Sequence, residues 1–373
     1  MSSTHASDFD ADFDVAVIGG GPAGAAAALG AARAGHSVAL FEPQAEPDKP
    51  CGEGILPAGV AALVELELAD LLARGRSLER IRYVLAAGRE LEVPLPTPGL
   101  ALERPVLAAA LAQALAGEAR ITRFARRVSS ARDERGFRLQ SGTEIWSART
   151  LIAADGLRGK SAAWLHGPRR AALLRRASRY GLRARALARR PLVGVEVHLG
   201  RESEVYLTPL TGGRINVAVL RDEFGPGEHA SSAWLAAALR EHPRAAALLG
   251  EWVTPPEARA LSRALPRRAA EAGAFLAGDA SGGIDPVLGC GVALALTTGL
   301  AAARAAGRVL ARGSGSPERE YRRFVRCETR VRAAIAGGLS LLARRPGLQP
   351  AVVRVLASWP RASARLARLV AGA

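Results

Sequence analysis

The chain has 373 residues, of which 49% are hydrophobic and 23% charged, and its net charge is +16. These proportions exclude a disordered chain and are typical of a folded protein of one or two domains. All basic residues but Lys49 and Lys160 are arginines, and no zinc-finger, RNP or helix-turn-helix pattern accompanies them. We therefore attribute the basicity to a compositional preference for arginine and predict no nucleic-acid partner.

The cysteines and the N-terminal sequence bear on the compartment. Cys51, Cys290 and Cys327 are scattered and form neither a disulfide framework nor a paired metal-ligand spacing, which indicates a reducing, cytoplasmic compartment. The six histidines also lack ligand spacing, so we predict no metal site. Residues 1–11 have neither the basic nor the apolar region of a signal peptide, and we expect a short disordered tail.

The first predicted unit is a βαβ unit. A strand over 14–18 leads into a glycine-rich turn, an alanine-rich helix follows over 23–34, and a second strand over 37–41 ends before Glu42. The turn carries the pattern G-x-G-x-x-G at Gly19, Gly21 and Gly24. These glycines would permit a tight turn, the approach of a pyrophosphate and close helix–strand packing, while Ala23 and the helix N-terminus face the phosphates.

Glu42 narrows the choice of dinucleotide. A carboxylate at the end of the second strand can accept hydrogen bonds from ribose hydroxyl groups and would repel a 2′-phosphate. The sequence therefore predicts a site for FAD or NAD rather than NADP.

The later elements follow from periodicity and turn residues. The nine arginines of residues 169–190 suggest a surface loop with strand edges. The uncharged stretch 286–303 is rich in Gly and Thr and indicates a buried helix rather than a membrane span. Helices are predicted over 59–73, 102–116, 231–249, 288–310 and most of 313–373, and strands over 81–93, 120–152, 193–199, 205–210, 214–220 and 274–276.

Three later segments resemble the flavoprotein family of p-hydroxybenzoate hydroxylase and its relatives. Arg104 opens a helix that resembles the family's Arg-x-x-Leu helix, in which the arginine approaches the FAD pyrophosphate. The family often has an acid where Ala108 stands here, so this match is imperfect. The segment LIAADGLRGKS resembles the family's Asp-Gly segment and implies a cofactor role for Asp155 and Gly156.

The third segment, FLAGDASGGIDPVLGCGVALA, resembles the family's Gly-Asp segment. The resemblance implies that Gly278 and Asp279 contact the cofactor, with Asp279 on the ribityl chain, and that Pro286 lies near the flavin ring. It also implies that the turn formed by Gly289, Cys290 and Gly291 offers N–H groups to the flavin's pyrimidine edge. A glycine-rich turn that opens a helix suits the negative charge of reduced flavin.

The loop KPCGEGILP resembles the corresponding loop of geranylgeranyl-reductase-like flavoproteins and some natural-product monooxygenases. The resemblance implies that Cys51 faces the substrate cavity, with an inert thiol as the alternative. Glu53 is either a proton carrier or a solvated side chain. Tyr206 and Thr208 share one face of a strand that lines the substrate pocket in relatives, although ordinary packing also explains Tyr206.

The predicted fold class is α/β, with a Rossmann-type FAD-binding domain, an inserted substrate domain with an antiparallel or mixed sheet, and C-terminal helices. The FAD-binding domain is expected to be discontinuous. We assign 12–58, 99–175 and 266–312 to the FAD-binding domain, 59–98 and 176–265 to the substrate domain, and 313–373 to the helical segment.

Three reactions fit these motifs. The sequence favours a monooxygenase of secondary metabolism with NAD(P)H as external reductant. An FAD-dependent reductase of isoprenoid double bonds is the alternative, since position 282 lacks the histidine that is frequent in aromatic hydroxylases. A halogenase is disfavoured because its catalytic lysine and its Trp-x-Trp-x-Ile-Pro segment are missing.

The partners follow from the same motifs. We expect a small-molecule substrate, and a lipophilic one would agree with the arginine-rich amphipathic C-terminus. That segment either packs as a solvated face on its own domain or contacts a membrane surface. The sequence leaves the oligomeric state open.

Overall fold

The structure is a computed structural model, and it leaves some of the sequence-based predictions undescribed. Cys51 and nearly all of the N-terminal tail lie outside the described residues. The structure describes residues 11–45, 52–85, 88–132, 136–157, 159–161, 165, 179–222, 231–261, 268–311, 315–358, 365 and 368–371.

The first sheet holds the predicted βαβ unit. Its strands follow the order β15-β16-β9-β1-β2-β6, and β8 and then β7 are added beside β9. Strand β1 pairs in parallel with both β2 and β9, and β2 pairs in parallel with β6. The bounds are β1 Phe13–Ile18, β2 Val38–Phe41, β6 Ile121–Phe124, β7 Ser129–Arg132, β8 Phe137–Ser141, β9 Glu144–Ala153, β15 Ala270–Glu271 and β16 Ala274–Leu276.

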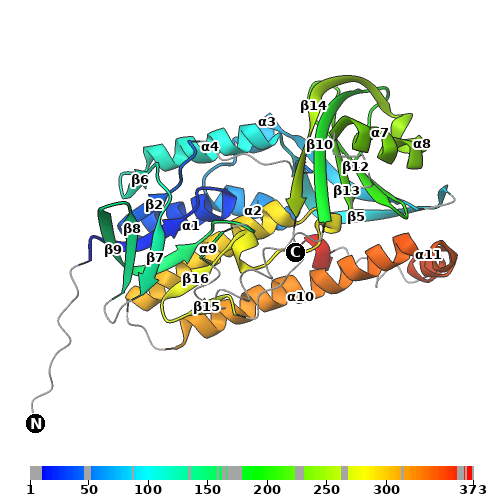
Figure 1. Ribbon diagram of the computed structural model, residues 1–373. Coiled ribbons are helices and arrows are strands. Elements are labelled where there is room, and N and C mark those ends of the chain that lie inside the picture. The colour runs from blue at the N-terminus through cyan, green and yellow to red at the C-terminus, as the bar shows by residue number, and fades with distance from the viewer. Residues whose placement is uncertain are drawn as a thin grey trace, which may run out of the picture.

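Helices α1 (Pro22–Arg33), α4 (Arg104–Gly117) and α9 (Gly291–Leu310) belong to this half of the molecule (Figure 1). Small residues let α1 and α9 approach closely. An added Cβ at Gly30 would stand 3.2 Å from the Ala303 side chain, and one at Gly299 would stand 2.2 Å from the Ala23 carbonyl oxygen. The alanine-rich sequence of α1 is therefore explained by burial on nearly all sides.

The second sheet is mostly antiparallel and lies at the other end of the molecule (Figure 1). Helices α7 (Ser231–Glu241) and α8 (Pro243–Ala246) cover one side, where Trp234 packs with Leu182 and Val205. The strand order is β14-β10-β13-β12-β11-β4-β5-β3. The bounds are β3 Gly54–Ile55, β4 Arg76–Val84, β5 Glu90–Ala101, β10 Arg179–Ala188, β11 Val195–Leu199, β12 Ser203–Pro209, β13 Arg214–Arg221 and β14 Leu249–Leu261.

One sequence-based expectation fails in this sheet, and one of its strands was not predicted. The arginine-rich stretch is not a surface loop over 179–188, because β10 lies between β13 and β14 and its Arg179, Arg183 and Arg185 are buried. Strand β14, which includes Pro255, was not predicted, since its two prolines argue against a strand. It can hold them because it is the last strand in the sheet order.

The domain boundaries stay a prediction. Strands β12 and β13 lie in the second sheet, apart from the glycine-rich turn. Gly54–Ile55, assigned by sequence to the FAD-binding domain, pairs with the end of β5 and so also belongs to the second sheet. The chain thus passes between the two sheets within the loop that precedes α2 (Pro57–Glu65) and α3 (Leu71–Arg74).

The C-terminal helices run beneath both sheets (Figure 1). Helix α10 (Pro317–Arg344) is followed by the 3₁₀ helix η4 (Pro346–Leu348) and by α11 (Gln349–Ser358). Among the described residues, no helix is both long enough and apolar enough to span a bilayer. The predicted α/β fold class with C-terminal helices is confirmed.

Candidate functional site

The glycine-rich turn between β1 and α1 forms the first part of the site. Gly19 has φ of +99°, and an added Cβ would stand 2.4 Å from the Ala154 carbonyl oxygen. An added Cβ at Gly24 would stand 1.7 Å from the Gly19 carbonyl oxygen, so only glycine fits there. Gly21 differs, since nothing lies within 4 Å of an added Cβ and the residue lines the central cavity. The turn therefore presents bare backbone to a ligand at the start of α1.

Glu42 and Arg104 border this turn. Glu42 accepts hydrogen bonds from the Gly20 N–H at 2.8 Å and from the Gln44 N–H at 3.0 Å, which fix its carboxylate at the cavity wall. Arg104, the first residue of α4, is buried and also lines the cavity. A carboxylate beside a guanidinium at a helix N-terminus suits a ribose next to a pyrophosphate.

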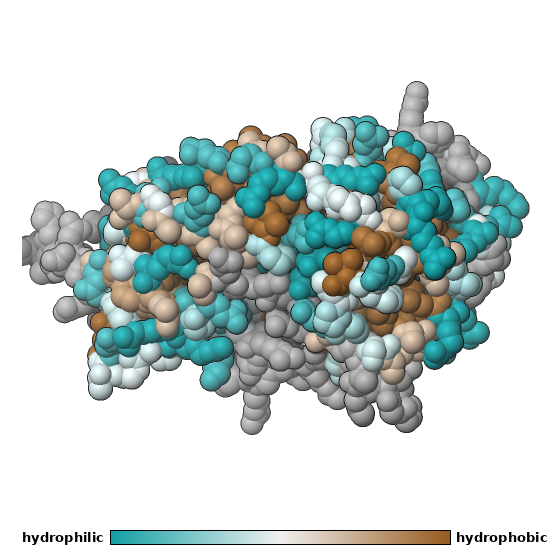
Figure 2. Space-filling model, turned by 90° about the horizontal axis from the view of Figure 1, so that it is seen from above, coloured by the Kyte–Doolittle hydropathy of each residue, from teal (hydrophilic) through white to brown (hydrophobic). Residues whose placement is uncertain are grey.

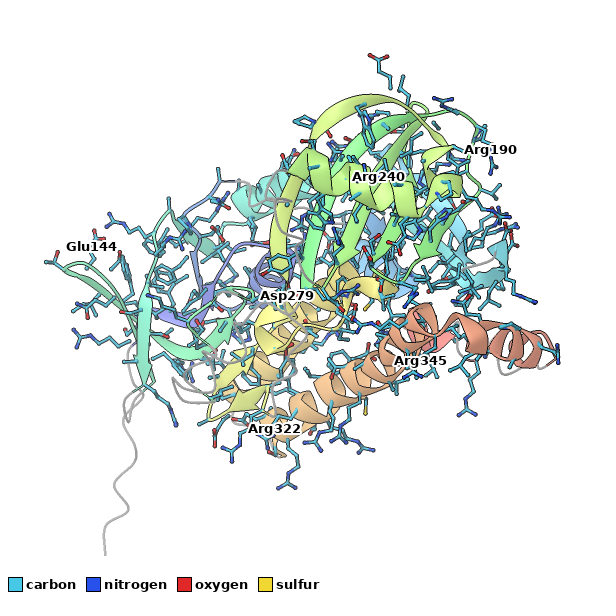
Figure 3. All side chains as sticks on the ribbon, turned by 45° about the vertical axis from the view of Figure 1, so that its right-hand side comes forward. Glu144, Arg190, Arg240, Asp279, Arg322 and Arg345 are labelled. Carbon is cyan, nitrogen blue, oxygen red and sulfur yellow. The ribbon has the colours of Figure 1, made fainter. Side chains whose placement is uncertain are left out.

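Asp155 and Asp279 come from separate segments and both line the cavity. Asp155 follows β9, and its Oδ2 accepts a hydrogen bond from the Ser161 N–H, whereas its buried Oδ1 has no partner among the described residues. Burial raises the pKa of this carboxyl. Asp279 lies in the 3₁₀ helix η2 (Gly278–Ser281), near the centre of the molecule (Figure 3). At Gly278, with φ of +59°, an added Cβ would stand 2.7 Å from the Ala23 Cβ, so η2 meets α1 there.

The segment that precedes α9 is a second glycine-rich turn. Asp285 caps the 3₁₀ helix η3 (Pro286–Leu288) by accepting a hydrogen bond from the Val287 N–H at 3.1 Å. No atom lies within 4 Å of an added Cβ at Gly289 or Gly291, and both glycines line the cavity. Between them, burial raises the pKa of the Cys290 thiol to about 11, so this cysteine is no thiolate nucleophile.

A cavity of about 380 Å³ joins these segments to the second sheet. This volume lies within the range of small-molecule sites. Away from the two turns the lining is mostly apolar, and its polar atoms are few. The apolar and aromatic lining residues include Leu56, Leu78, Ile81, Tyr83, Leu95, Val195, Val197, Tyr206, Ala218, Leu220, Val287 and Leu288.

Thr208 and Tyr206 reach this cavity from β12. The Thr208 hydroxyl donates a hydrogen bond to the Gly52 carbonyl oxygen at 2.7 Å, which ties the strand to the loop that carries Glu53. The Tyr206 hydroxyl donates to Glu204 Oε2 at 2.8 Å. Burial raises the pKa of Tyr206 well above its usual value, and the charge of Glu204 adds to this effect. The phenol therefore keeps its proton.

Glu53 is not a solvated side chain. It is buried, with φ of +56°, and its carboxylate contacts Arg185 directly and lies 3.6 Å from Arg183 Nη1. Its Oε1 also accepts a hydrogen bond from the Arg104 N–H at 3.0 Å. Through these contacts Glu53 links β10 of the second sheet to the start of α4, and it also lines the cavity.

A second buried ion cluster surrounds Arg179 and was missed by sequence analysis. Arg179 Nη2 lies 2.9 Å from Glu204 Oε1, and Nη1 lies 2.7 Å from Asp285 Oδ1. The guanidinium thus connects β12 with the residue that caps η3. The signal lay in the arginines of residues 179–185, whose spacings of four and two residues, at 179, 183 and 185, place them on one face of a strand.

The residues of the two turns fit an FAD. Open space beside the backbone of Gly21, Gly289 and Gly291 leaves room for a ligand, and Asp155 Oδ1, which has no partner among the described residues, offers a buried acceptor. Phosphates suit the start of α1, and an electron-rich ring suits the start of α9. Within the described ranges, no three His, Cys, Asp or Glu side chains gather as metal ligands.

Comparison with known proteins agrees with this fit. A family described as FAD dependent oxidoreductase matches residues 14–136, which include the glycine-rich turn, Glu42 and Arg104. This part of the chain is therefore similar to FAD-dependent oxidoreductases.

Two curated relatives match only part of the chain. A menaquinone reductase of Mycobacterium tuberculosis is 39% identical over 163 residues, which cover 40% of this chain and 39% of the relative. Digeranylgeranylglycerophospholipid reductase 2 of Methanopyrus kandleri is 33% identical over 159 residues, again 40% and 39% of the two chains. The matched segments thus span about two fifths of the relatives' length.

Similarity to solved structures extends over nearly the whole chain. A triple mutant of the flavin-dependent brominase Bmp2 superposes with a TM-score of 0.80 over 96% of this chain and 94% of that chain, at 16% identity. At such low identity the likeness shows the fold alone. The chain therefore shares its fold with the brominase over nearly its whole length, and its sequence similarity to the two reductases extends over about two fifths of it.

Proposed function

We propose that this protein is an FAD-dependent reductase that saturates a carbon–carbon double bond of a lipophilic, isoprenoid-like substrate. The observation that carries the proposal is the Tyr206 hydroxyl, hydrogen-bonded to Glu204 at the wall of an apolar cavity beside the two glycine-rich turns. The curated relatives support it, because both are named as reductases.

The cavity lining supports a lipophilic substrate. Aliphatic side chains of β4, β11 and η3, among them Ile81, Val197 and Leu288, face the space between the second sheet and the turn before α9. Such a surface gains free energy by contact with a hydrocarbon chain, roughly 25 cal/mol for each Å² removed from water. A small charged substrate would gain nothing from it.

Reduction of a double bond needs a hydride and a proton. FAD that has been reduced by an external two-electron donor, which we take to be NAD(P)H, supplies the hydride when bound. In our proposal, the Tyr206 hydroxyl turns from Glu204 Oε2 toward the substrate and donates its proton to the neighbouring carbon, while Arg179 holds the Glu204 carboxylate. The π bond is replaced by two C–H bonds, and solvent returns the proton to the tyrosine.

The proposal is tested by product analysis under anaerobic conditions. Protein loaded with FAD and reduced chemically would be mixed with polyprenyl quinones and geranylgeranyl compounds. The masses of the products would then be measured by mass spectrometry. We expect a product with two additional hydrogens. Tyr206→Phe should slow its formation at least about a hundredfold, the usual contribution of a positioned acid. An unchanged rate in Tyr206→Phe would remove this residue from the mechanism.

Monooxygenation is the second candidate, and the matching motifs at the cavity favour it. Arg104, Asp155 and Asp279, whose segments resemble those of p-hydroxybenzoate hydroxylase relatives, all line the cavity. This reaction would consume oxygen and add an oxygen atom to the substrate. A product with an added oxygen under aerobic conditions, and none without oxygen, would replace the reductase proposal.

A further inference from the structure

The C-terminal part of the chain has a charge pattern unlike the rest. Residues 329–373 contain eight arginines and neither Asp nor Glu, whereas the whole chain has 51 basic and 35 acidic residues. Such an acid-free basic segment cannot be neutralised by its own side chains. Arg332 and Arg344 are paired with Glu328 and Asp222 outside the segment, whereas exposed arginines such as Arg330 and Arg345 are available to an external anionic surface.

The exposed side of α10 carries part of this charge and adds Arg323, which precedes the acid-free segment. Arg323, Arg330 and Leu341 are exposed and recur at intervals of seven and eleven residues, which places them on one stripe of the helix. Neither Arg323 nor Arg330 forms an ion pair with an acid in the described part of the chain. Arg345, labelled with Arg322 near the ends of α10 in Figure 3, is also exposed and continues the stripe.

Aliphatic side chains are exposed on the same segment. Leu341 is 54% exposed, Leu348 50%, and Leu369 41%. They lie on α10, on η4 and near the C-terminus, each within a few residues of an exposed arginine. On the upper face of the molecule, by contrast, hydrophilic side chains separate the hydrophobic patches (Figure 2). We call Arg323, Arg330, Leu341, Arg345 and Leu348 the basic–aliphatic face.

We infer that the basic–aliphatic face docks on the surface of an anionic lipid bilayer. Arginines beside exposed leucines match the two layers of a membrane interface, because the guanidinium groups meet phosphates while the leucines enter the acyl boundary. Single-stranded RNA would need aromatic side chains for stacking, and no aromatic residue is among the exposed large hydrophobic side chains described on α10, η4 and α11. An acidic protein would leave the leucines without a matching partner.

The opposite side of α10 faces the cavity. Thr329 lines the cavity, and Ala336 and Leu342 pack in the same cluster as Leu288 and Cys290 of the turn before α9. One helix, about 10 Å thick, therefore separates the cavity from the basic–aliphatic face. A lipophilic substrate would have a short path from the bilayer, a consequence that rests on the proposed function, whereas the docking itself does not.

Vesicle flotation tests the inference without any substrate. Full-length protein loaded with FAD would be floated with phosphatidylcholine vesicles, with vesicles that contain phosphatidylglycerol, and with the latter at high salt. We expect flotation only with the anionic vesicles at low salt, since surface charge attraction is screened by ions. The triple variant Arg323→Gln, Arg330→Gln, Arg345→Gln should bind about a hundredfold more weakly, at roughly fivefold for each arginine.

Matched variants separate the face from the net charge. Arg74→Gln, Arg138→Gln and Arg240→Gln together remove the same charge from exposed positions elsewhere, and this triple should float like the unmodified protein. Leu341→Gln should weaken binding several-fold, while Ile145→Gln, at a residue that is 49% exposed on β9, should not.

Three outcomes would overturn the inference. They are the absence of flotation with anionic vesicles, equal loss in both arginine triples, and salt-sensitive binding to RNA or to an acidic protein without binding to vesicles. Because none of these readouts uses the reaction, failure of the docking and failure of the reductase proposal are distinguishable.

Discussion

The two sheets form their shares of the site by opposite means. Around the first sheet, function depends on missing side chains, since Gly19 and Gly24 allow the tight turn and Gly21 leaves open space beside the backbone for a ligand. Around the second sheet it depends on buried charged side chains, since Arg179 and Arg185 hold the carboxylates of Asp285 and Glu53 at the cavity wall. A cofactor with fixed phosphates can be held by backbone, whereas a reacting substrate needs side chains that are placed one by one.

The largest expected effect comes from a substitution in the glycine-rich turn of the first sheet. In Gly24→Ala the new Cβ would overlap the Gly19 carbonyl oxygen, 1.7 Å away, so the turn must move. We expect a loss of about 3 kcal/mol or more in the free energy of unfolding, and loss of FAD binding. Gly117→Ala at the end of α4 meets nothing within 4 Å and serves as the control. Urea unfolding measures both, and equal stabilities would refute the packing role of Gly24.

The next largest effect comes from a substitution among the buried charged side chains of the second sheet. Arg179→Gln removes the guanidinium from the buried carboxylates of Glu204 and Asp285, and we expect unfolding to become easier by about 3–5 kcal/mol. Arg138→Gln, at an exposed position on β8, should change little. A double-mutant cycle with Glu204→Gln should recover part of the loss, because it removes the unpaired charge. Additive losses would show that the two residues do not interact.

Glu53 tests the contact between the halves. Glu53→Gln weakens charged hydrogen bonds to Arg185 and to the Arg104 N–H, which we expect to cost about 1.5–3 kcal/mol. The exposed Glu251→Gln on β14 is the matched control. Thermal unfolding with and without FAD gives both values. A Glu53→Gln protein as stable as its control would mean that the carboxylate's charge is not used.

These results also show what a sequence can reveal. The glycine-rich turn and Glu42 were predictable, because the strand, turn and helix that define them are neighbours in the chain. The partners of Glu53 and Arg179 were not, since they lie 132 residues (Arg185) and 106 residues (Asp285) away along the chain. Burial of β10 could not be predicted either. Arginines on a strand are expected to be exposed unless the carboxylates that pair with them are known.

The smallest effect is a pH dependence of stability that comes from His242, beside the second sheet. His242 is buried, which lowers its pKa below the usual 6.5, although Glu241 opposes this. Below pH 6.5 the unfolded chain therefore binds a proton that the folded protein takes up only at lower pH. Stability is full above this range and falls as the pH drops through it. Melting temperatures at a series of pH values should show this slope, and His242→Gln should flatten it, whereas His36→Gln should leave it unchanged.

The division between backbone and side chains is tested most directly by the FAD content of two variants. Absorbance near about 450 nm after FAD addition and gel filtration would be measured for unmodified protein, Gly21→Val and Tyr206→Phe. We predict one FAD per chain in the unmodified protein and in Tyr206→Phe, and none in Gly21→Val. The valine side chain clashes with no other residue, so the protein should fold, but it fills the path of the pyrophosphate. FAD retained by Gly21→Val, or lost from Tyr206→Phe, would contradict the account.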